Sequence, residues 1–208
     1  MIDLKDIPAS WLGVLEDIQK VCPSAVLAGG ALRDLYHGVE VKDLDIFIQA
    51  GDEAESWGLF EKLGGKRPKD FTEFGYGLQD LSDMDSDGGA YPRSMQEVIL
   101  VENYVGENPT DIPVQLIFVN WNTARIHERF DIGICRVSTD GVKVFVSKEF
   151  KEDHHEKVLN IRRCENKWML GSSIERIVRL REKYADFQIA LEGLKFSNET
   201  IQVDNQEV

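Results

Sequence analysis

The segment from Ala25 to Ile48 constrains the fold of this chain more than any other stretch. It reads Ala-Val-Leu-Ala-Gly-Gly-Ala-Leu-Arg-Asp over residues 25–34 and Val-Lys-Asp-Leu-Asp-Ile-Phe-Ile over residues 41–48. An apolar run that ends in two glycines predicts a buried strand at 25–28, followed by a tight turn into a helix at 30–37. The alternation after Lys42 predicts a second strand at 43–49. This pattern favours a mixed sheet with helices packed on one side.

The polar residues of this segment predict a site. Side chains alternate across a strand, so Asp43 and Asp45 face the same way, roughly 6–7 Å apart along the backbone. Gly29 and Gly30 leave the backbone N–H groups at the helix start open to a phosphate, because a side chain there would hinder close approach. Two carboxylates opposite a phosphate cradle are what a divalent-metal phosphoryl-transfer site requires.

The order Gly29-Gly30-Ala31-Leu32-Arg33-Asp34, then Asp43-Leu44-Asp45, resembles a family signature. It is similar to the head domain of the DNA polymerase β superfamily, and most similar to that of CCA-adding enzymes and bacterial poly(A) polymerases. The resemblance implies an α+β fold, a mixed β-sheet nucleotidyltransferase core with helices packed on one side and a C-terminal helical extension.

The same resemblance implies roles for single residues. Asp43 and Asp45 would hold Mg²⁺ (or Mn²⁺), Gly29 and Gly30 would seat a triphosphate, and Arg33 would help to neutralise it. We group Lys42, which directly precedes the acidic pair, with the nucleotide-binding residues. The alternative for Arg33 and Asp34 is a solvated helix face.

A second stretch, residues 172–187, resembles the arginine-bearing helix that follows the head domain in CCA-adding enzymes. Ser172 and Glu175 fit a capping box, and the sequence supplies an apolar stripe made of Ile174, Ile177, Val178 and Leu180. Arg176 and Arg179 lie three residues apart, so both can reach toward one phosphate or acceptor from the same side. The alternative is a surface helix whose arginines pair with Glu175 and Glu182.

Superfamily members normally carry a third carboxylate on a neighbouring strand, and here the expected position holds Gln115. A neutral amide offers an oxygen but no charge. Asp131 is the only acid within the apolar strand predicted at 130–137, so we nominate it as the third catalytic and metal-binding carboxylate, or as a group that supports the metal ligands. The alternative is an acid at the end of a strand that pairs with Arg129 or Arg136.

The rest of the chain predicts further elements of the same sheet. We expect a helix over 53–63, a long loop over 64–95, strands at 96–104 and 113–119, and a short helix near 122–128. A hairpin should join 130–137 to 142–146 through Asp140-Gly141. The head domain would cover residues 1–150, the helical extension 151–196, and an acidic, flexible tail 197–208.

Composition narrows the partners. The net charge of −13 argues against a broad nucleic-acid-binding surface, because each phosphate contact needs a cation. Three cysteines without Cys-x-x-Cys spacing signal neither a zinc site nor a disulfide framework. The start of the chain lacks the pattern of a signal peptide, and no stretch approaches the length of a membrane span, so we expect a cytoplasmic protein without membrane contact.

These features together predict a metal-dependent nucleotidyltransferase. It would transfer a nucleotidyl group from a nucleoside triphosphate to a hydroxyl and release pyrophosphate. The acceptor stays open between an RNA 3′ end, a protein and a small molecule. Because Gln115 stands where an acid is expected, the alternative is an inactive nucleotide-binding or protein-interaction module that retains the fold.

Overall fold

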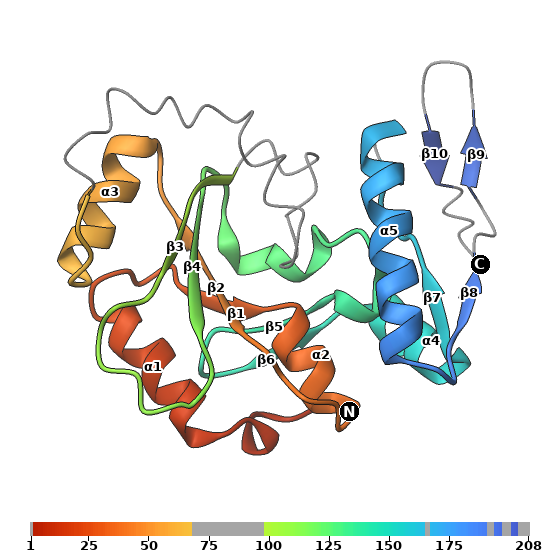
Figure 1. Ribbon diagram of the computed structural model, residues 1–208, viewed down its shortest axis with the longest axis horizontal. Helices are drawn as coiled ribbons and strands as arrows, with labels where there is room; N and C mark the ends of the chain where they lie inside the picture. Colours follow the sequence, from red (N-terminus) through yellow and green to blue (C-terminus); the bar gives the residue numbers. More distant parts are fainter. Residues whose placement is uncertain (1, 68–97, 165–166, 191–193, 197–200, 204–208) are drawn as a thin grey trace.

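The computed structural model describes residues 2–67, 98–164, 167–190, 194–196 and 201–203. Its centre is a six-stranded sheet with the strand order β3-β4-β2-β1-β5-β6 (Figure 1). Only β2 and β4 run parallel; the other neighbours in this sheet are antiparallel. The strands are β1 (Val26–Ala28), β2 (Leu44–Gln49), β3 (Val98–Asn103), β4 (Val114–Val119), β5 (Val137–Thr139) and β6 (Val144–Val146).

Helices cover one face of this sheet. The alternate residues Leu44, Ile46 and Ile48 of β2 are almost fully buried, and they belong to an apolar cluster with α1, α2 and α3. Each of these helices buries an apolar stripe on the sheet, as in Trp57 and Phe60 of α3. Their bounds are α1 (Ala9–Gln19), α2 (Gly30–Tyr36) and α3 (Glu53–Lys62), and a short 3₁₀ helix, η1 (Leu4–Asp6), precedes them.

The opposite face packs against 3₁₀ helices and the C-terminal part of the chain. Phe47 and Ile117 belong to a second apolar cluster that continues through Ile126 and Phe130 to Ile177. The elements on this side are η3 (Thr123–Glu128), η4 (Gly133–Cys135), α4 (Lys148–Glu156), β7 (Val158–Asn160), α5 (Lys167–Lys183) and β8 (Gln188–Ala190). In Figure 1 α4, α5, β7 and β8 gather beside the sheet.

Most predicted elements are confirmed. They include β1 and β4, the two neighbours of the acidic strand β2, and the helix over 53–63. The predicted strand at 130–137 is wrong in its first part, because this segment turns through η4 and only Val137–Thr139 joins the sheet. Ile132 instead forms a bridge with Ile161, and the carbonyl of Asp131 accepts the backbone N–H groups of Arg162 and Arg163. Residues 130–136 therefore hydrogen-bond to the C-terminal part of the chain.

The C-terminal extension is not purely helical. Strands β7 and β8 form a parallel pair, and β9 (Leu194–Phe196) pairs with β10 (Ile201–Val203). The remainder of the predicted tail, and most of the loop predicted at 64–95, lie outside the described residues. The domain boundary near residue 150 stays a prediction. Among the described helices, none is long and apolar enough to cross a membrane.

Candidate active site

The turn between β1 and α2 requires glycine for two reasons. Gly29 has φ +79°, in the region that side chains disfavour. A Cβ at Gly29 would also lie 3.1 Å from the ring of Phe130. The N–H of Gly29 donates to the carbonyl of Val137 at 2.9 Å, which ties the turn to β5. The turn is therefore held in a fixed shape, in which Gly29 is buried and Gly30 is partly exposed.

The two aspartates lie at the end of β2 that is next to this turn. Strand β1 runs antiparallel to β2 with Leu27 opposite Ile46, so the chain leaves β1 toward Gly29 on the Asp45 side of the sheet. Asp43 and Asp45 are half-buried, whereas Leu44 between them is fully buried and Lys42 is exposed. The alternation predicted for this strand is present, and it leaves the two carboxylates on the face opposite α1.

Gln115 lies directly beside Asp45. The two residues are register partners in the parallel pair β2–β4, where neighbouring strands are about 4.8 Å apart. On the far side of Gln115 its partner is Asn103 of β3. The row across the sheet thus reads amide, amide, carboxylate, and the place adjacent to Asp45 on β4 carries no negative charge.

Asp131, predicted as a third carboxylate, is occupied elsewhere. It is 2% exposed, and it accepts hydrogen bonds from Arg176 Nη1 at 2.6 Å and from Ser173 Oγ at 2.6 Å, both on α5. The N–H of Ile132 donates to the same carboxylate at 3.0 Å. Asp131 thus forms a buried ion pair, as in the alternative prediction, but its partner is Arg176 rather than Arg129 or Arg136.

The arginine-bearing helix differs from its predicted form. Helix α5 begins at Lys167, so Ser172 lies inside it and the predicted capping box is wrong. Ile177 and Leu180 are buried as predicted, but Ile174 and Val178 are exposed, at 39% and 51%. Arg176 reaches Asp131, whereas Arg179 is exposed on the helix surface.

Arg33 and Asp34 are buried, and neither belongs to a solvated helix face. Arg33 Nε donates to Asp34 Oδ1 at 2.7 Å and to Tyr184 Oη at 3.0 Å. Arg33 Nη1 contacts the sulfur of Cys135 at 3.1 Å. Asp34 in turn accepts hydrogen bonds from Lys183 and Tyr184. We call Arg33, Asp34, Lys183 and Tyr184 the α2–α5 quartet.

Burial and charge act in opposite directions within this quartet. Burial by itself would raise the pKa of Asp34, but the Arg33 guanidinium and the donors of Lys183 and Tyr184 hold it below its usual value. Burial would lower the pKa of Arg33, yet the surrounding thiol, phenol and carboxylate groups keep it above normal. Burial raises the pKa of Tyr184 and of Cys135. At neutral pH the quartet therefore holds two cations, one anion and a neutral phenol.

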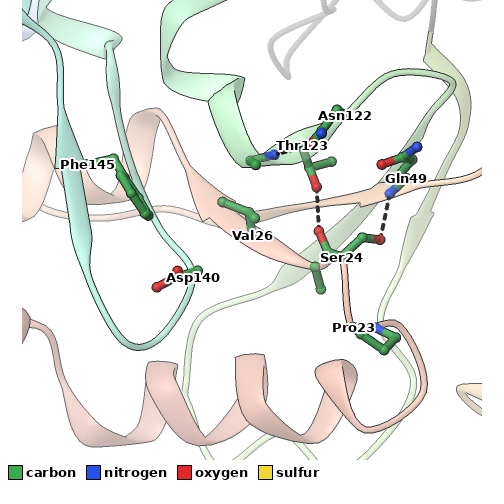
Figure 2. A pocket seen from close by; sticks show the side chains of 10 residues that line it. Pro23, Ser24, Val26, Gln49, Asn122, Thr123, Asp140 and Phe145 are labelled. Carbon is green, nitrogen blue, oxygen red and sulfur yellow. Dashed lines mark hydrogen bonds between the residues drawn. The ribbon is translucent and has the colours of Figure 1, made fainter.

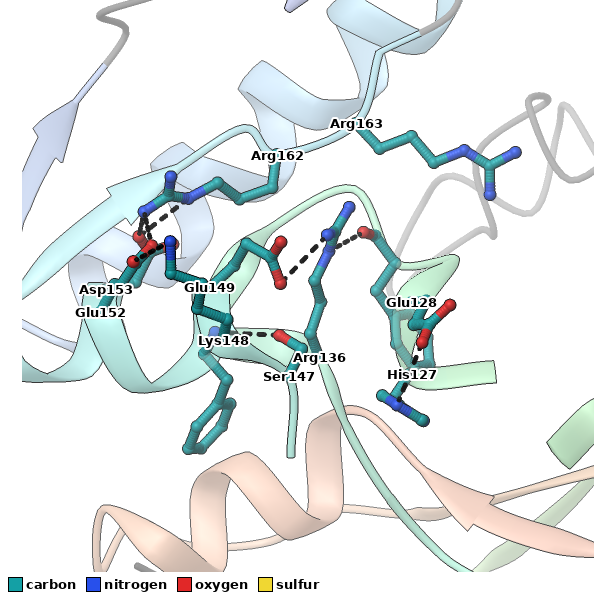
Figure 3. Close-up of polar contacts among 12 residues, drawn as sticks. His127, Glu128, Arg136, Ser147, Lys148, Glu149, Glu152, Asp153, Arg162 and Arg163 are labelled. Carbon is teal, nitrogen blue, oxygen red and sulfur yellow. Dashed lines mark hydrogen bonds and ion pairs between the residues drawn. The ribbon is translucent and has the colours of Figure 1, made fainter. Parts of the chain in front are cut away.

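Other arginines of the chain are also engaged in internal pairs. Figure 3 shows Arg162 against Asp153, with Arg162 Nε donating at 3.0 Å. Arg136 donates to the carbonyl of Phe130 at 2.8 Å and lies 3.5 Å from Glu149. Asp153 is fully buried, and burial raises its pKa to about 6. These pairs hold α4 and residues 130–136 together.

A surface pocket of about 250 Å³ lies at the opposite end of β1 and β2 (Figure 2). Ser24 and Val26 bring the start of β1 to it, Gln49 is the last residue of β2, and Asn122 follows β4. None of the predicted site residues lines it. The predicted site instead lies at the other end of these central strands. The Gly29–Gly30 turn, Asp43, Asp45 and Gln115 form this end of the sheet, which we call the edge.

The donor set at this edge suits a hard divalent cation only in part. Within the described ranges, no group of three His, Cys, Asp or Glu side chains could hold a metal ion. Two carboxylates and an amide oxygen do fit Mg²⁺, which commonly binds through one or two carboxylates together with substrate phosphates. A metal at this edge would accordingly be completed by the oxygens of a bound phosphate.

No family model and no curated protein matches the chain, but solved structures match its fold. A Thermotoga maritima CCA-adding enzyme complexed with tRNA has a TM-score of 0.56 at 14% identity, covering 90% of this chain and 41% of the enzyme. A Bacillus stearothermophilus CCA-adding enzyme in complex with CTP has a TM-score of 0.55 at 16% identity, covering 88% of this chain and 42% of that one. The chain has the nucleotidyltransferase-head fold of CCA-adding enzymes. A CCA-adding enzyme solved with ATP also shares it, with a TM-score of 0.56 at 14% identity, over 90% of this chain and 40% of the enzyme.

The chain spans less than half the length of these enzymes. In this chain β1 and β2 are neighbours in the sheet, so the glycine turn and the aspartate pair lie at the same end of adjacent strands.

Sequence reasoning missed the partners that α5 supplies. Tyr184 and Lys183 carry no motif of their own, and they lie about 150 residues from Arg33 and Asp34 in the chain. Ser173 was expected in the first turn of a helix rather than beneath Asp131. The nearest available signal was the spacing of Ile177, Leu180 and Tyr184, which puts the tyrosine on the apolar stripe of the helix, where its hydroxyl usually needs a partner.

Proposed function

We propose that this chain is a metal-dependent nucleotidyltransferase. It binds a nucleoside triphosphate with Mg²⁺ (or Mn²⁺), transfers the nucleotidyl group to a hydroxyl acceptor and releases pyrophosphate. One observation carries the proposal: Asp43 and Asp45 lie at the sheet edge beside the Gly29–Gly30 turn, in a fold shared with enzymes solved with ATP and CTP.

The glycine turn, the two aspartates and Lys42 each have a part in nucleotide binding. Gly29 shapes the turn, and Gly30, which is partly exposed, lets phosphate oxygens approach the backbone. Asp43 and Asp45 would hold the cation, which when bound neutralises phosphate charge and polarises the reacting phosphorus centre. Lys42 is exposed next to the pair and adds a positive charge at the entrance.

The α5 arginines have different parts. Arg179 is exposed and is available to a phosphate or an acceptor. Arg176 is held by Asp131, so we assign both residues to the support of the site rather than to direct contact with the cation. The strongly acidic chain favours a small or local acceptor, such as an RNA 3′ end, a protein side chain or a metabolite hydroxyl, over long nucleic acid.

The test is transfer of label from nucleoside triphosphates to candidate acceptors, with Mg²⁺ or Mn²⁺ present. Asp43→Ala with Asp45→Ala should abolish labelling. Glu16→Ala with Asp17→Ala is the matched control, because it removes the same charge from exposed positions on α1 and should leave labelling unchanged. Labelling that survives the first double substitution would defeat the assignment.

A second candidate is a nucleotide-binding module that does not catalyse transfer. The observation that favours it is Gln115 opposite Asp45, since an amide cannot accept the proton of an attacking hydroxyl as a carboxylate can. Calorimetry would then detect nucleotide binding that is lost in the Asp43/Asp45 variant, with no pyrophosphate released for any acceptor. Pyrophosphate release that depends on Asp43 and Asp45 would exclude this candidate.

A further inference from the structure

The α2–α5 quartet fixes the orientation of the Arg33 guanidinium. This group is planar, and its donors point in fixed directions. Two points of the plane are fixed from outside α2: Tyr184 Oη lies 3.0 Å from Nε, and the Cys135 sulfur lies 3.1 Å from Nη1. Asp34 Oδ1 adds a third contact, at 2.7 Å from Nε. The direction of Nη2 is therefore determined by its neighbours.

Nη2 lies beside the glycine turn, 3.6 Å from the position that a Cβ on Gly30 would occupy. Gly30 carries no Cβ, so Nη2 borders the space that a side chain there would fill. A phosphate oxygen against the Gly29–Gly30 backbone would lie within reach of this guanidinium.

The charge of the quartet suits an anion. Asp34 is shared between two cations, with Arg33 on Oδ1 and Lys183 on Oδ2. The phenol of Tyr184 is neutral, so the four residues carry a net charge of +1. Without Lys183, Arg33 and Asp34 would form a neutral pair, and its attraction for phosphate would be weaker.

We propose that Tyr184 and Lys183 of α5 are positioning residues for triphosphate binding, because they hold Arg33 with Nη2 beside the Gly29–Gly30 turn. The inference rests on the proposed function and adds to it: the C-terminal helix orients a phosphate-binding side chain of the head. The competing explanation is that the quartet only docks α5 on α2.

Tyr184→Phe separates the two explanations. It removes the hydroxyl that fixes Nε and keeps the ring in the apolar cluster. We expect affinity for a ribonucleoside triphosphate with Mg²⁺, measured by calorimetry, to fall about three- to tenfold, the range for one lost hydrogen bond. Affinity for the matching nucleoside should not change, so the ratio of triphosphate to nucleoside affinity falls.

Tyr36→Phe is the matched control. Tyr36 lies at the end of α2, and its ring packs on Phe150 and His154. It should leave the triphosphate affinity and the ratio unchanged. Equal losses in both variants, or an unchanged ratio in Tyr184→Phe, would overturn the positioning role.

Lys183→Met gives a second measurement in case Tyr184→Phe fails to fold. The Lys183 side chain is 24% exposed, so its loss disturbs packing less. Triphosphate affinity should fall several-fold at low salt and by less at high salt, because the variant removes net charge. A triphosphate affinity equal to that of the wild type at both salt concentrations would overturn the proposal. If the wild-type protein binds none of the four ribonucleoside triphosphates, the proposed function itself fails.

Discussion

Removing the Arg176 side chain tests whether α5 is held by a buried ion pair. In Arg176→Met the Asp131 carboxylate, 2% exposed, would keep Ser173 Oγ and the N–H of Ile132 as its donors among the described residues. Breaking a buried pair from one side costs about 3–5 kcal/mol. Because the Arg176 side chain is 20% exposed, water screens the pair, and we expect about 3 kcal/mol.

Urea unfolding followed by tryptophan fluorescence measures the loss. Arg179→Met is the matched control, since Arg179 is exposed on the same helix, and its free energy of unfolding should stay within about 0.5 kcal/mol of the wild type. Asp131→Asn combined with Arg176→Met should recover part of the loss, because no uncompensated charge is then buried. The reasoning would be refuted if Arg176→Met lost less than about 1 kcal/mol of unfolding free energy, or if Arg176→Met and Arg179→Met lost equal amounts.

Three further outcomes are expected. Gln115→Asp restores a carboxylate beside Asp45 and should raise nucleotidyl transfer about tenfold or more in a labelling assay, since a general base commonly contributes that much. Gly29→Ala should cost about 1–3 kcal/mol of stability, because φ +79° with ψ −122° is a conformation that side chains disfavour, and it should also weaken triphosphate binding in calorimetry. Gly38→Ala, also at positive φ but with open space around it, should cost stability alone. Burial raises the pKa of Asp153 to about 6, so between pH 4 and 6 the folded state retains a proton that the unfolded state releases. The free energy of unfolding should therefore fall by up to about 1.4 kcal/mol per pH unit as the pH rises through this range. Asp153→Asn should remove this slope.

Local patterns were sufficient to predict the centre of the fold. The alternation from Asp43 to Ile46 distinguished the two faces of β2 at the site, since side chains of a strand point alternately to opposite faces. Phe47 is buried as well, because the second face is covered by the other apolar cluster. The positive φ of Gly29 is likewise a local requirement that the glycine pair signalled. The family resemblance, with the apolar run of β4, identified Gln115 as the residue at the position expected for a third acid, and Gln115 is the register partner of Asp45.

Residues 130–136 could not be predicted from local pattern, because distant partners determine their conformation. An apolar run interrupted by one acid reads as a strand, but this segment hydrogen-bonds to Arg162 and Arg163 and leaves the sheet. The segment around Gly133 packs closely on α4 because residue 133 has no side chain: a Cβ at this position would lie 1.8 Å from Asp153 Oδ2. The sequence shows the glycine and not the buried carboxylate against it.

Nucleotide binding and activation of the acceptor hydroxyl depend on different residues of this chain. Asp43 and Asp45 can offset a divalent cation, while the α2–α5 quartet presents net positive charge toward the glycine turn, so nucleotide binding needs no third carboxylate at the edge. Activation of an acceptor hydroxyl does need a base, and Gln115 cannot serve as one. Gln115→Asp should therefore change transfer more than binding. Tyr184→Phe should do the opposite, and one change affecting both equally would mean that the two tasks are not separable in this protein.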